Sequence, residues 1–148
     1  MNPIVECEQL SKIYKHHKAV DQVNLRLEEG KIYGLLGRNG AGKTTLLHMM
    51  TGQLFPSEGT VRIAGQSPFE NAEVLQHVCF IKESQQFLKN FKVADVLDLA
   101  AMIYPHWDNE YARELAADFS LDTSKKIRQL SRGMLSAVGV IIGLASRA

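Results

Sequence analysis

The sequence predicts an α/β fold with a mixed sheet, and three observations lead to this prediction. A glycine-rich loop at residues 37–44 lies between a short apolar run at 31–36 and a helix-like segment at 44–50. Elsewhere the first third of the chain alternates apolar and polar residues, as half-exposed strands do. From Val93 onward the apolar period becomes helical. The 148 residues, 45% hydrophobic and 22% charged, suit one soluble globular domain.

The overall charge and the N-terminus exclude several classes of partner and location. The formal net charge is +1, so the chain as a whole has no electrostatic bias toward nucleic acid or acidic lipid, and we expect no nucleic-acid partner. The first residues lack the bases and apolar core of a signal peptide, and no apolar run approaches the roughly 20 residues of a membrane span. We therefore expect a cytosolic protein, in which Cys7 and Cys79 are buried thiols rather than a disulfide.

The β-rich part contains two kinds of predicted strand. Half-exposed strands are expected at residues 4–14, 23–27 and 60–64. Short apolar runs that indicate buried strands lie at residues 31–36 and 78–81. The basic segment 15–18, Lys-His-His-Lys, is interpreted as a solvated hairpin tip, because two adjacent histidines without a nearby third ligand are a poor metal site.

Two helices follow in the second half of the chain. The apolar face of the first contains Val96, Leu99, Ala100 and Ile103. We expect this helix to end at Pro105, which lacks a backbone donor, and Asp108 to cap the next helix. The apolar face of the second helix contains Tyr111, Leu115 and Phe119. Trp107 lies at the joint, where packing is a better interpretation than ligand binding.

The glycine-rich loop is the strongest functional signal. It consists of Gly37, Arg38, Asn39, Gly40, Ala41, Gly42, Lys43 and Thr44, a complete G-x-x-x-x-G-K-[ST] phosphate-binding pattern. Its glycines permit left-handed backbone angles and leave no side chains between chain and ligand. Successive N–H groups can then surround an anion at a helix N-terminus. Lys43 can reach the β- and γ-phosphates of a nucleotide, and the Thr44 hydroxyl can ligate Mg²⁺.

A second phosphate-binding candidate precedes the last apolar segment, residues 135–145. Residues 130–134 read Leu-Ser-Arg-Gly-Met, and Ser131 is well placed to cap the following helix. Taken alone, Ser131 is best interpreted as a plain N-cap. Because a phosphate loop lies roughly 90 residues upstream with a helical insert between, we interpret this helix end as a phosphate-binding site.

This order of parts resembles the nucleotide-binding domain of ABC transporters. The segment 33–46 matches that family closely, and residues 130–134 stand at the place of its signature motif. The resemblance covers the whole chain and implies a P-loop NTPase of the ABC type. It divides the chain into a β-rich subdomain with the phosphate loop (1–83), a helical subdomain (84–131) and a signature helix (132–148).

The resemblance also implies roles for individual residues. Tyr14 would stack on adenine, although a strand tyrosine with a half-buried ring is the alternative interpretation. Thr45 would contact the α-phosphate. Ser131 and Gly133 would face the γ-phosphate of ATP held by a second subunit, because family members form homo- or heterodimers that enclose two nucleotides.

Two departures from the family pattern concern the signature and the metal site. Arg132 and Met134 replace the usual glycine and glutamine of the signature. Where the family has a glutamine that contacts Mg²⁺, this sequence has Glu83, and Gln85 and Gln86 follow closely. A carboxylate can also ligate Mg²⁺, so Glu83 is the expected metal ligand and a two-residue shift is the alternative.

The implied function is that of an ATP-binding subunit. Such a protein binds ATP and Mg²⁺, hydrolyses ATP when complete and dimerised, and drives a membrane-spanning partner from the cytosolic face of the plasma membrane. Residues 104–108, Tyr-Pro-His-Trp-Asp, resemble a segment of ABC-2 exporters. Family members continue past the signature helix into a strand with the Walker B aspartate and catalytic glutamate. We therefore expect an N-terminal portion with an incomplete sheet, and the alternative function is a nucleotide-binding fragment without catalysis.

Overall fold

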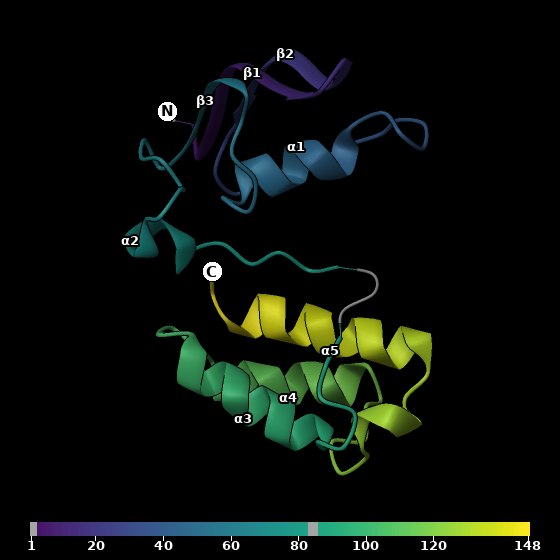
Figure 1. Ribbon diagram of the computed structural model, residues 1–148. Coiled ribbons are helices and arrows are strands. Elements are labelled where there is room, and N and C mark those ends of the chain that lie inside the picture. Colours follow the sequence, from purple (N-terminus) through teal and green to yellow (C-terminus); the bar gives the residue numbers. More distant parts are fainter. Residues whose placement is uncertain (1–2, 83–85) are drawn as a thin grey trace. The chain divides into compact units, whose positions relative to one another are not determined.

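The computed structural model describes residues 3–82 and 86–148 (Figure 1). The chain divides into two compact units, Met1–Leu75 and Gln76–Ala148. The α/β class predicted from the sequence is confirmed: three strands and two short helices make up the described first unit, and helices make up the second. The finer division at residues 83 and 131 stays a prediction.

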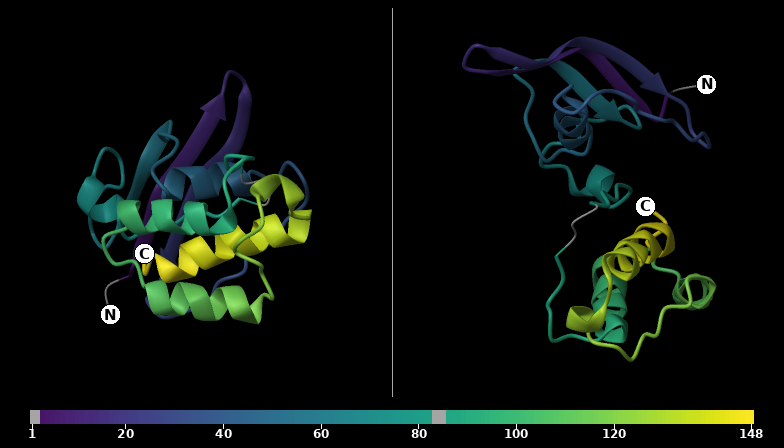
Figure 2. Two further views of the ribbon diagram at one scale, coloured as in Figure 1. Left: turned by 90° about the horizontal axis from the view of Figure 1, so that it is seen from below. Right: turned by 90° about the vertical axis from the view of Figure 1, so that its right-hand side faces the viewer.

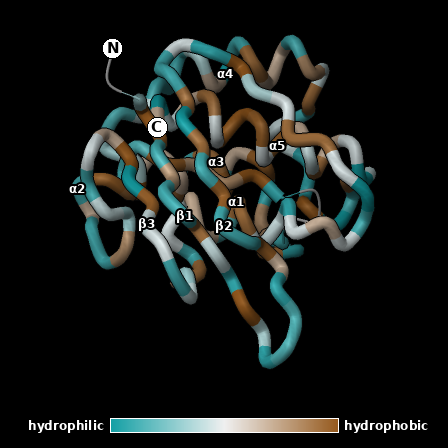
Figure 3. Tube along the Cα trace, turned by 90° about the horizontal axis from the view of Figure 1, so that it is seen from above, coloured by the Kyte–Doolittle hydropathy of each residue, from teal (hydrophilic) through white to brown (hydrophobic). Residues whose placement is uncertain are grey.

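The first unit contains a three-stranded antiparallel sheet in the order β2-β1-β3. Its elements are β1 (Val5–Tyr14), β2 (His17–Leu27), α1 (Lys43–Met50), β3 (Glu58–Ile63) and α2 (Ala72–Leu75). The expected hairpin is confirmed, but its turn is shorter than the predicted 15–18: Tyr14 pairs with His17 across a two-residue turn in which Lys15 has φ 53°, and β2 begins at His17. Figure 3 shows that this tip is hydrophilic.

Helix α1 covers one face of the sheet (Figure 2). The buried residues of this core come from both layers and are Cys7, Leu10, Val20, Leu46, Met49, Met50 and Val61. Their burial removes apolar surface from water and holds the start of α1 in place. Burial and the nearby Glu6 charge raise the pKa of the Cys7 thiol to about 11, so this cysteine is the inert buried thiol that the sequence predicted.

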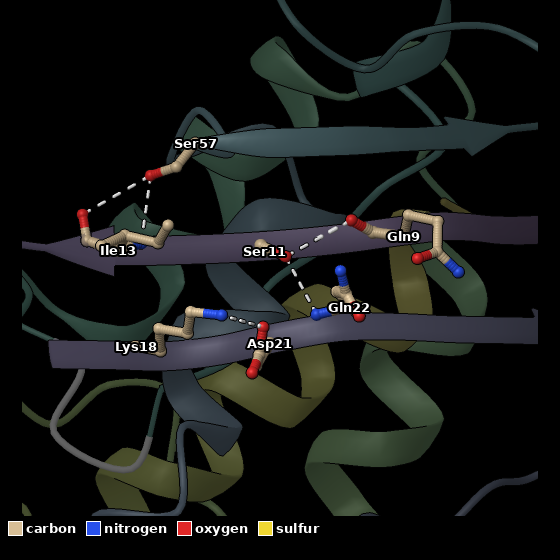
Figure 4. Close-up of polar contacts among 7 residues, drawn as sticks. All are labelled: Gln9, Ser11, Ile13, Lys18, Asp21, Gln22 and Ser57. Carbon is tan, nitrogen blue, oxygen red and sulfur yellow. Dashed lines mark hydrogen bonds and ion pairs between the residues drawn. The ribbon is translucent and has the colours of Figure 1, made fainter.

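A buried hydroxyl bridges an irregularity between β1 and β2 (Figure 4). The register shifts there, and Gln9 and Gln22 both have φ 48°. Ser11 is 1% exposed, and its Oγ accepts from Gln22 N at 2.9 Å and donates to Gln9 O at 3.4 Å. The hydroxyl therefore satisfies a backbone N–H group that the strand ladder leaves without a partner.

The two predicted buried strands are not strands in the structure. Residues 31–36 are extended but exposed, with Leu36 at 93%, and within the described chain no strand pairs with them. An apolar run becomes a buried strand only when neighbouring strands supply hydrogen bonds on its edges. Residues 78–81 instead pack by side chain: Ile81 lies against Gly143, whose missing Cβ leaves it room.

The second unit is helical. It contains α3 (Val93–Ile103), α4 (Asn109–Asp118), the 3₁₀ turn η1 (Ile127–Gln129) and α5 (Arg132–Ala145). Its core is formed by buried residues of all four elements, among them Val93, Val96, Leu115, Ile127, Val138 and Ile141. Within the described residues, no helix is long and apolar enough to cross a bilayer.

The predicted end of α3 and the predicted cap of α4 are confirmed. Helix α3 ends two residues before Pro105, and Asp108 caps α4, where its Oδ1 accepts from Tyr111 N at 2.9 Å. Arg147 Nη2 donates to the other oxygen at 2.8 Å, and these bonds lower the pKa of Asp108. Trp107 packs on the core as expected, and its Nε1 donates to Asn109 Oδ1 at 3.0 Å.

The predicted apolar faces are correct only in part. Val96, Ala100 and Leu115 are buried, but Leu99, Ile103 and Phe119 are exposed. Phe119 follows the last residue of α4 and serves as its C-cap, which takes it off the buried stripe. Leu99 and Ile103 lie on the helical period, yet no described element covers their side of α3.

The buried Ser11 hydroxyl yields a stability prediction. Ser11→Ala should lower the free energy of unfolding by about 1–3 kcal/mol, because the Gln22 N–H would be buried without an acceptor. Ser57→Ala is the matched control, since the Ser57 hydroxyl bonds Ile13 N but is exposed to water, which can replace it. Urea denaturation measures both, and equal effects of the two changes would contradict the bridging role of Ser11.

Candidate functional site

The glycine-rich loop leads directly into α1 at the surface of the first unit. Arg38, Asn39, Gly40 and Ala41 are exposed, and Ala41 N donates to Arg38 O at 3.1 Å. The first helical hydrogen bond runs from Leu46 N to Gly42 O at 2.9 Å. The loop therefore closes a turn on itself and then opens a helix whose N-terminus faces solvent.

Two glycines of this loop are required by backbone conformation. Gly40 has φ 82°, and Gly42, the N-cap of α1, has φ 84°. Side chains other than glycine rarely adopt such angles. The two positions differ in space: a Cβ at Gly42 would collide with the carbonyl oxygen of Ala19 in β2, whereas a Cβ at Gly40 would meet nothing within 4 Å. Gly37 is not in the left-handed region, so its predicted conformational role is not needed here.

The helix start offers hydrogen-bond donors to an anion. The N–H groups of Lys43, Thr44 and Thr45 open α1, and in the described part of the chain they have no acceptor. No acidic residue lies in the first turn of α1, so no carboxylate of that turn competes for them. The helix dipole adds partial positive charge at the same end.

Lys43 places a full positive charge on the loop. Its Nζ donates to Gly37 O at 2.6 Å and to Arg38 O at 2.8 Å. These acceptors are neutral carbonyls, and an anionic oxygen would form stronger bonds with the same ammonium group. The loop, its N–H groups and Lys43 together have the donors and the charge that a strongly anionic, phosphate-like group requires.

Tyr14 lies at the same end of the first unit as this loop. It ends β1 and pairs with His17 of β2. Two residues further along β2, about 7 Å from His17, is Ala19, whose carbonyl Gly42 approaches. Tyr14 as a residue is 47% exposed, and Lys12 Nζ lies 5.5 Å from the centroid of its ring. The ring therefore has a face that a flat ligand could cover while its phosphates reach the loop.

The second helix N-terminus belongs to the second unit. Ser131 caps α5, since its Oγ accepts from Met134 N at 3.3 Å. The predicted capping role is thus confirmed. In the described residues the N–H groups of Arg132 and Gly133 have no acceptor, and both residues are exposed. Like α1, this helix has no acidic residue in its first turn.

The predicted metal ligand Glu83 lies outside the described residues, as does Gln85. Gln86 is exposed and borders a cavity of about 290 Å³ in the second unit. Sequence reasoning missed this cavity. Most of its lining is apolar and includes Phe87, Leu88, Leu99, Ile103 and Tyr104. The signal was present in the apolar stripe of α3, but a stripe does not show whether its partner surface belongs to the same chain.

Comparisons with known proteins agree on one family. The family model described as ABC transporter matches residues 20–148. The ABC transporter ATP-binding protein YtrB of Bacillus subtilis is 32% identical over 97% of this chain and 49% of its own length. The bacitracin transport ATP-binding protein BcrA of Bacillus licheniformis is 34% identical over 95% of this chain and 47% of its own. The chain thus spans about half the length of these curated relatives.

Solved structures show the same fold. The ATP-binding subunit of an ABC transporter has a TM-score of 0.86 at 26% identity, over 97% of this chain and 62% of its own. A putative ABC transporter ATP-binding protein from Pyrococcus furiosus has a TM-score of 0.82 at 25% identity, over 95% of this chain and 70% of its own.

The glycine geometry yields a paired prediction. Gly40→Ala should lower the free energy of unfolding by about 1–2 kcal/mol, the cost of a left-handed angle. Gly42→Ala should cost about 3 kcal/mol or more, because the new methyl group must also displace the Ala19 carbonyl. Urea denaturation compares the two. Equal losses would show that the loop does not approach β2 closely.

Proposed function

This chain belongs to the ABC transporter family, and on that premise we propose that it binds MgATP as the N-terminal part of an ATP-binding subunit. The observation that supports this most strongly is the phosphate loop, where left-handed glycines, unpaired N–H groups and the Lys43 ammonium meet at the start of α1. In the complete protein, this binding would precede ATP hydrolysis and transport.

The triphosphate would bind through groups that this chain already presents. Phosphate oxygens would accept from the N–H groups at the start of α1. Lys43 would exchange the carbonyls of Gly37 and Arg38 for anionic oxygens, a gain because charge-assisted bonds are roughly twice as strong. Thr44 would offer its hydroxyl to Mg²⁺ and Thr45 would contact the α-phosphate. Mg²⁺, when bound, would neutralise phosphate charge; Glu83 is proposed as a further ligand.

Adenine would lie on Tyr14. The support is the exposed ring and its placement near the point where Gly42 meets β2. The nearby Lys12 ammonium, which also donates to Phe55 O at 2.7 Å, limits the ring face that is free for a base. Stacking on the opposite face is therefore part of the proposal.

A second subunit would complete the site. Ser131 and Gly133 begin α5 in the same manner as the phosphate loop begins α1, with exposed N–H groups and no acid in the first turn. We propose that this helix end faces the γ-phosphate of ATP bound to a second copy or a related subunit. Ser131 then has two roles, because its Oγ already accepts from Met134 N.

A membrane-spanning partner would receive the work of hydrolysis on the cytosolic face of the plasma membrane. The second unit has exposed apolar side chains that suit a partner surface, including Leu88 at 62% and Ile103 at 73% exposed. They border the apolar cavity beside Gln86. Burial of such side chains against a partner would remove them from water.

Lys43→Ala should weaken MgATP binding about 100-fold or more. In the described loop, the Lys43 ammonium is the only full charge that bonds to loop carbonyls, and it would bond to the phosphates instead. Lys31→Ala is the matched control, since Lys31 is exposed, lies six residues before the loop in the sequence and pairs with Glu28. Isothermal titration calorimetry measures both. Unchanged affinity of the Lys43 variant would contradict the proposed site.

Tyr14→Ala should weaken ATP binding about tenfold, the usual contribution of one aromatic–base stack, and should leave tripolyphosphate binding unchanged. Tyr14→Phe should retain ATP affinity, because the ring face is kept. Titrations of the three proteins with both ligands separate the interpretations. If ATP affinity does not change in the alanine variant, Tyr14 is only a strand residue.

A further inference from the structure

Two segments of the second unit, far apart in the sequence, form a short backbone ribbon. Ile127 N donates to Phe91 O at 2.9 Å, and Arg128 N donates to Lys89 O at 3.1 Å. Lys92 and Lys126 face each other as an antiparallel bridge. We call residues 89–92 and 125–128 the basic ribbon, which lies at the N-terminal end of α3 (Figure 1).

The basic ribbon concentrates positive charge on its outer side. Its five cations are Lys89, Lys92, Lys125, Lys126 and Arg128. Phe91 and Ile127 turn into the core of the unit. At the bridge between Lys92 and Lys126, side chains alternate as along extended backbone, so these two lysines turn away from the side of Phe91 and Ile127. Arg128 lies in the 3₁₀ turn η1, where this alternation does not apply, and it is exposed. Lys126 is half-buried and the other four cations are exposed.

These charges have few counter-ions. Throughout the described chain, none of the five cations forms an ion pair within 4.0 Å. Asp95 uses its carboxylate to accept from Lys92 N, and Asp122 accepts from Ser124, with Lys125 helping to lower its pKa. Like charges placed opposite each other in a ribbon destabilise it. Folding therefore does not explain this cluster in a chain with a net charge of only +1.

Apolar groups adjoin the cations. A cavity of about 450 Å³ is lined by Phe87, Lys89, Arg128 and Leu135 among others, and it shares Gln86 and Phe87 with the apolar cavity of about 290 Å³. Leu88, next to Lys89, is among the exposed apolar side chains. A surface that combines unpaired lysines with exposed apolar side chains is typical of proteins that lie on anionic lipid.

We propose that the basic ribbon binds an anionic phospholipid surface. Four of its five cations are lysines, which carry a compact charge on a flexible side chain. Such charges suit many dispersed phosphates, whereas bidentate recognition of a single carboxylate favours arginine. An acidic protein segment is the competing partner. The lipid contact needs no nucleotide, so it goes beyond the proposed function and can fail or succeed independently of it.

Vesicle co-sedimentation of the full chain without nucleotide tests this proposal. The probes are phosphatidylcholine vesicles with and without 40% phosphatidylglycerol. We expect partition onto the anionic vesicles only, with a strong decrease in 0.5 M salt. The triple variant Lys92→Gln, Lys126→Gln and Arg128→Gln should partition about 100-fold less, because each charge near the surface contributes about fivefold.

Three matched proteins control the result. Lys18→Gln, Lys31→Gln and Arg113→Gln together remove the same charge elsewhere and should leave partition unchanged. Lys92→Arg, Lys126→Arg and Arg128→Lys should preserve it, and Lys43→Ala should as well. Equal losses in both neutralised triples, or no partition of the parent chain, would overturn the proposal. Tight binding to polyglutamate without vesicle binding would also overturn it and assign the ribbon to an acidic protein.

Discussion

The approach of Gly42 to the backbone of Ala19 is the contact on which the phosphate loop depends. It places the N-cap of α1 directly against β2, and the buried face of α1 then packs on the sheet through Leu46, Met49 and Met50. A larger residue at position 42 would hold the helix start away from the strand. The alignment of N–H groups, the position of Lys43 and the distance to Tyr14 all follow from this one close approach.

The same physical solution appears twice in the chain. Helix α1 begins after a glycine in the left-handed region, and α5 begins after a capping serine, yet both present N–H groups without an acceptor among the described residues and no acid in their first turn. A helix start of this kind attracts anions through the dipole and the free donors together. The two helix starts differ in where their cation lies. The Lys43 ammonium at α1 is held against the loop by hydrogen bonds, whereas the Arg132 side chain at α5 is exposed.

Much of the local structure could be predicted from residues alone. The sequence identified Asp108 and Ser131 as helix caps, Pro105 as a boundary and a turn within the basic segment 15–18, because short-range hydrogen bonding and fixed backbone angles determine such features. Predictions that required a partner surface were less successful. Residues 31–36 and 78–81 are apolar but unpaired in the described sheet, and Leu99 and Ile103 continue a helical stripe beyond the surface that α3 buries.

By itself, the sequence determined the α/β class, the helix limits, the glycine-rich loop and the family to which the chain belongs, since each of these depends on residues close together in the chain. Only the tertiary structure decided that Gly42, and not Gly40, touches β2, that Ser11 bridges two strands, and that five cations meet in the basic ribbon. The physical reason is the same in each case. A local pattern shows what a residue can do, whereas close approach, burial and charge density depend on segments that folding brings together.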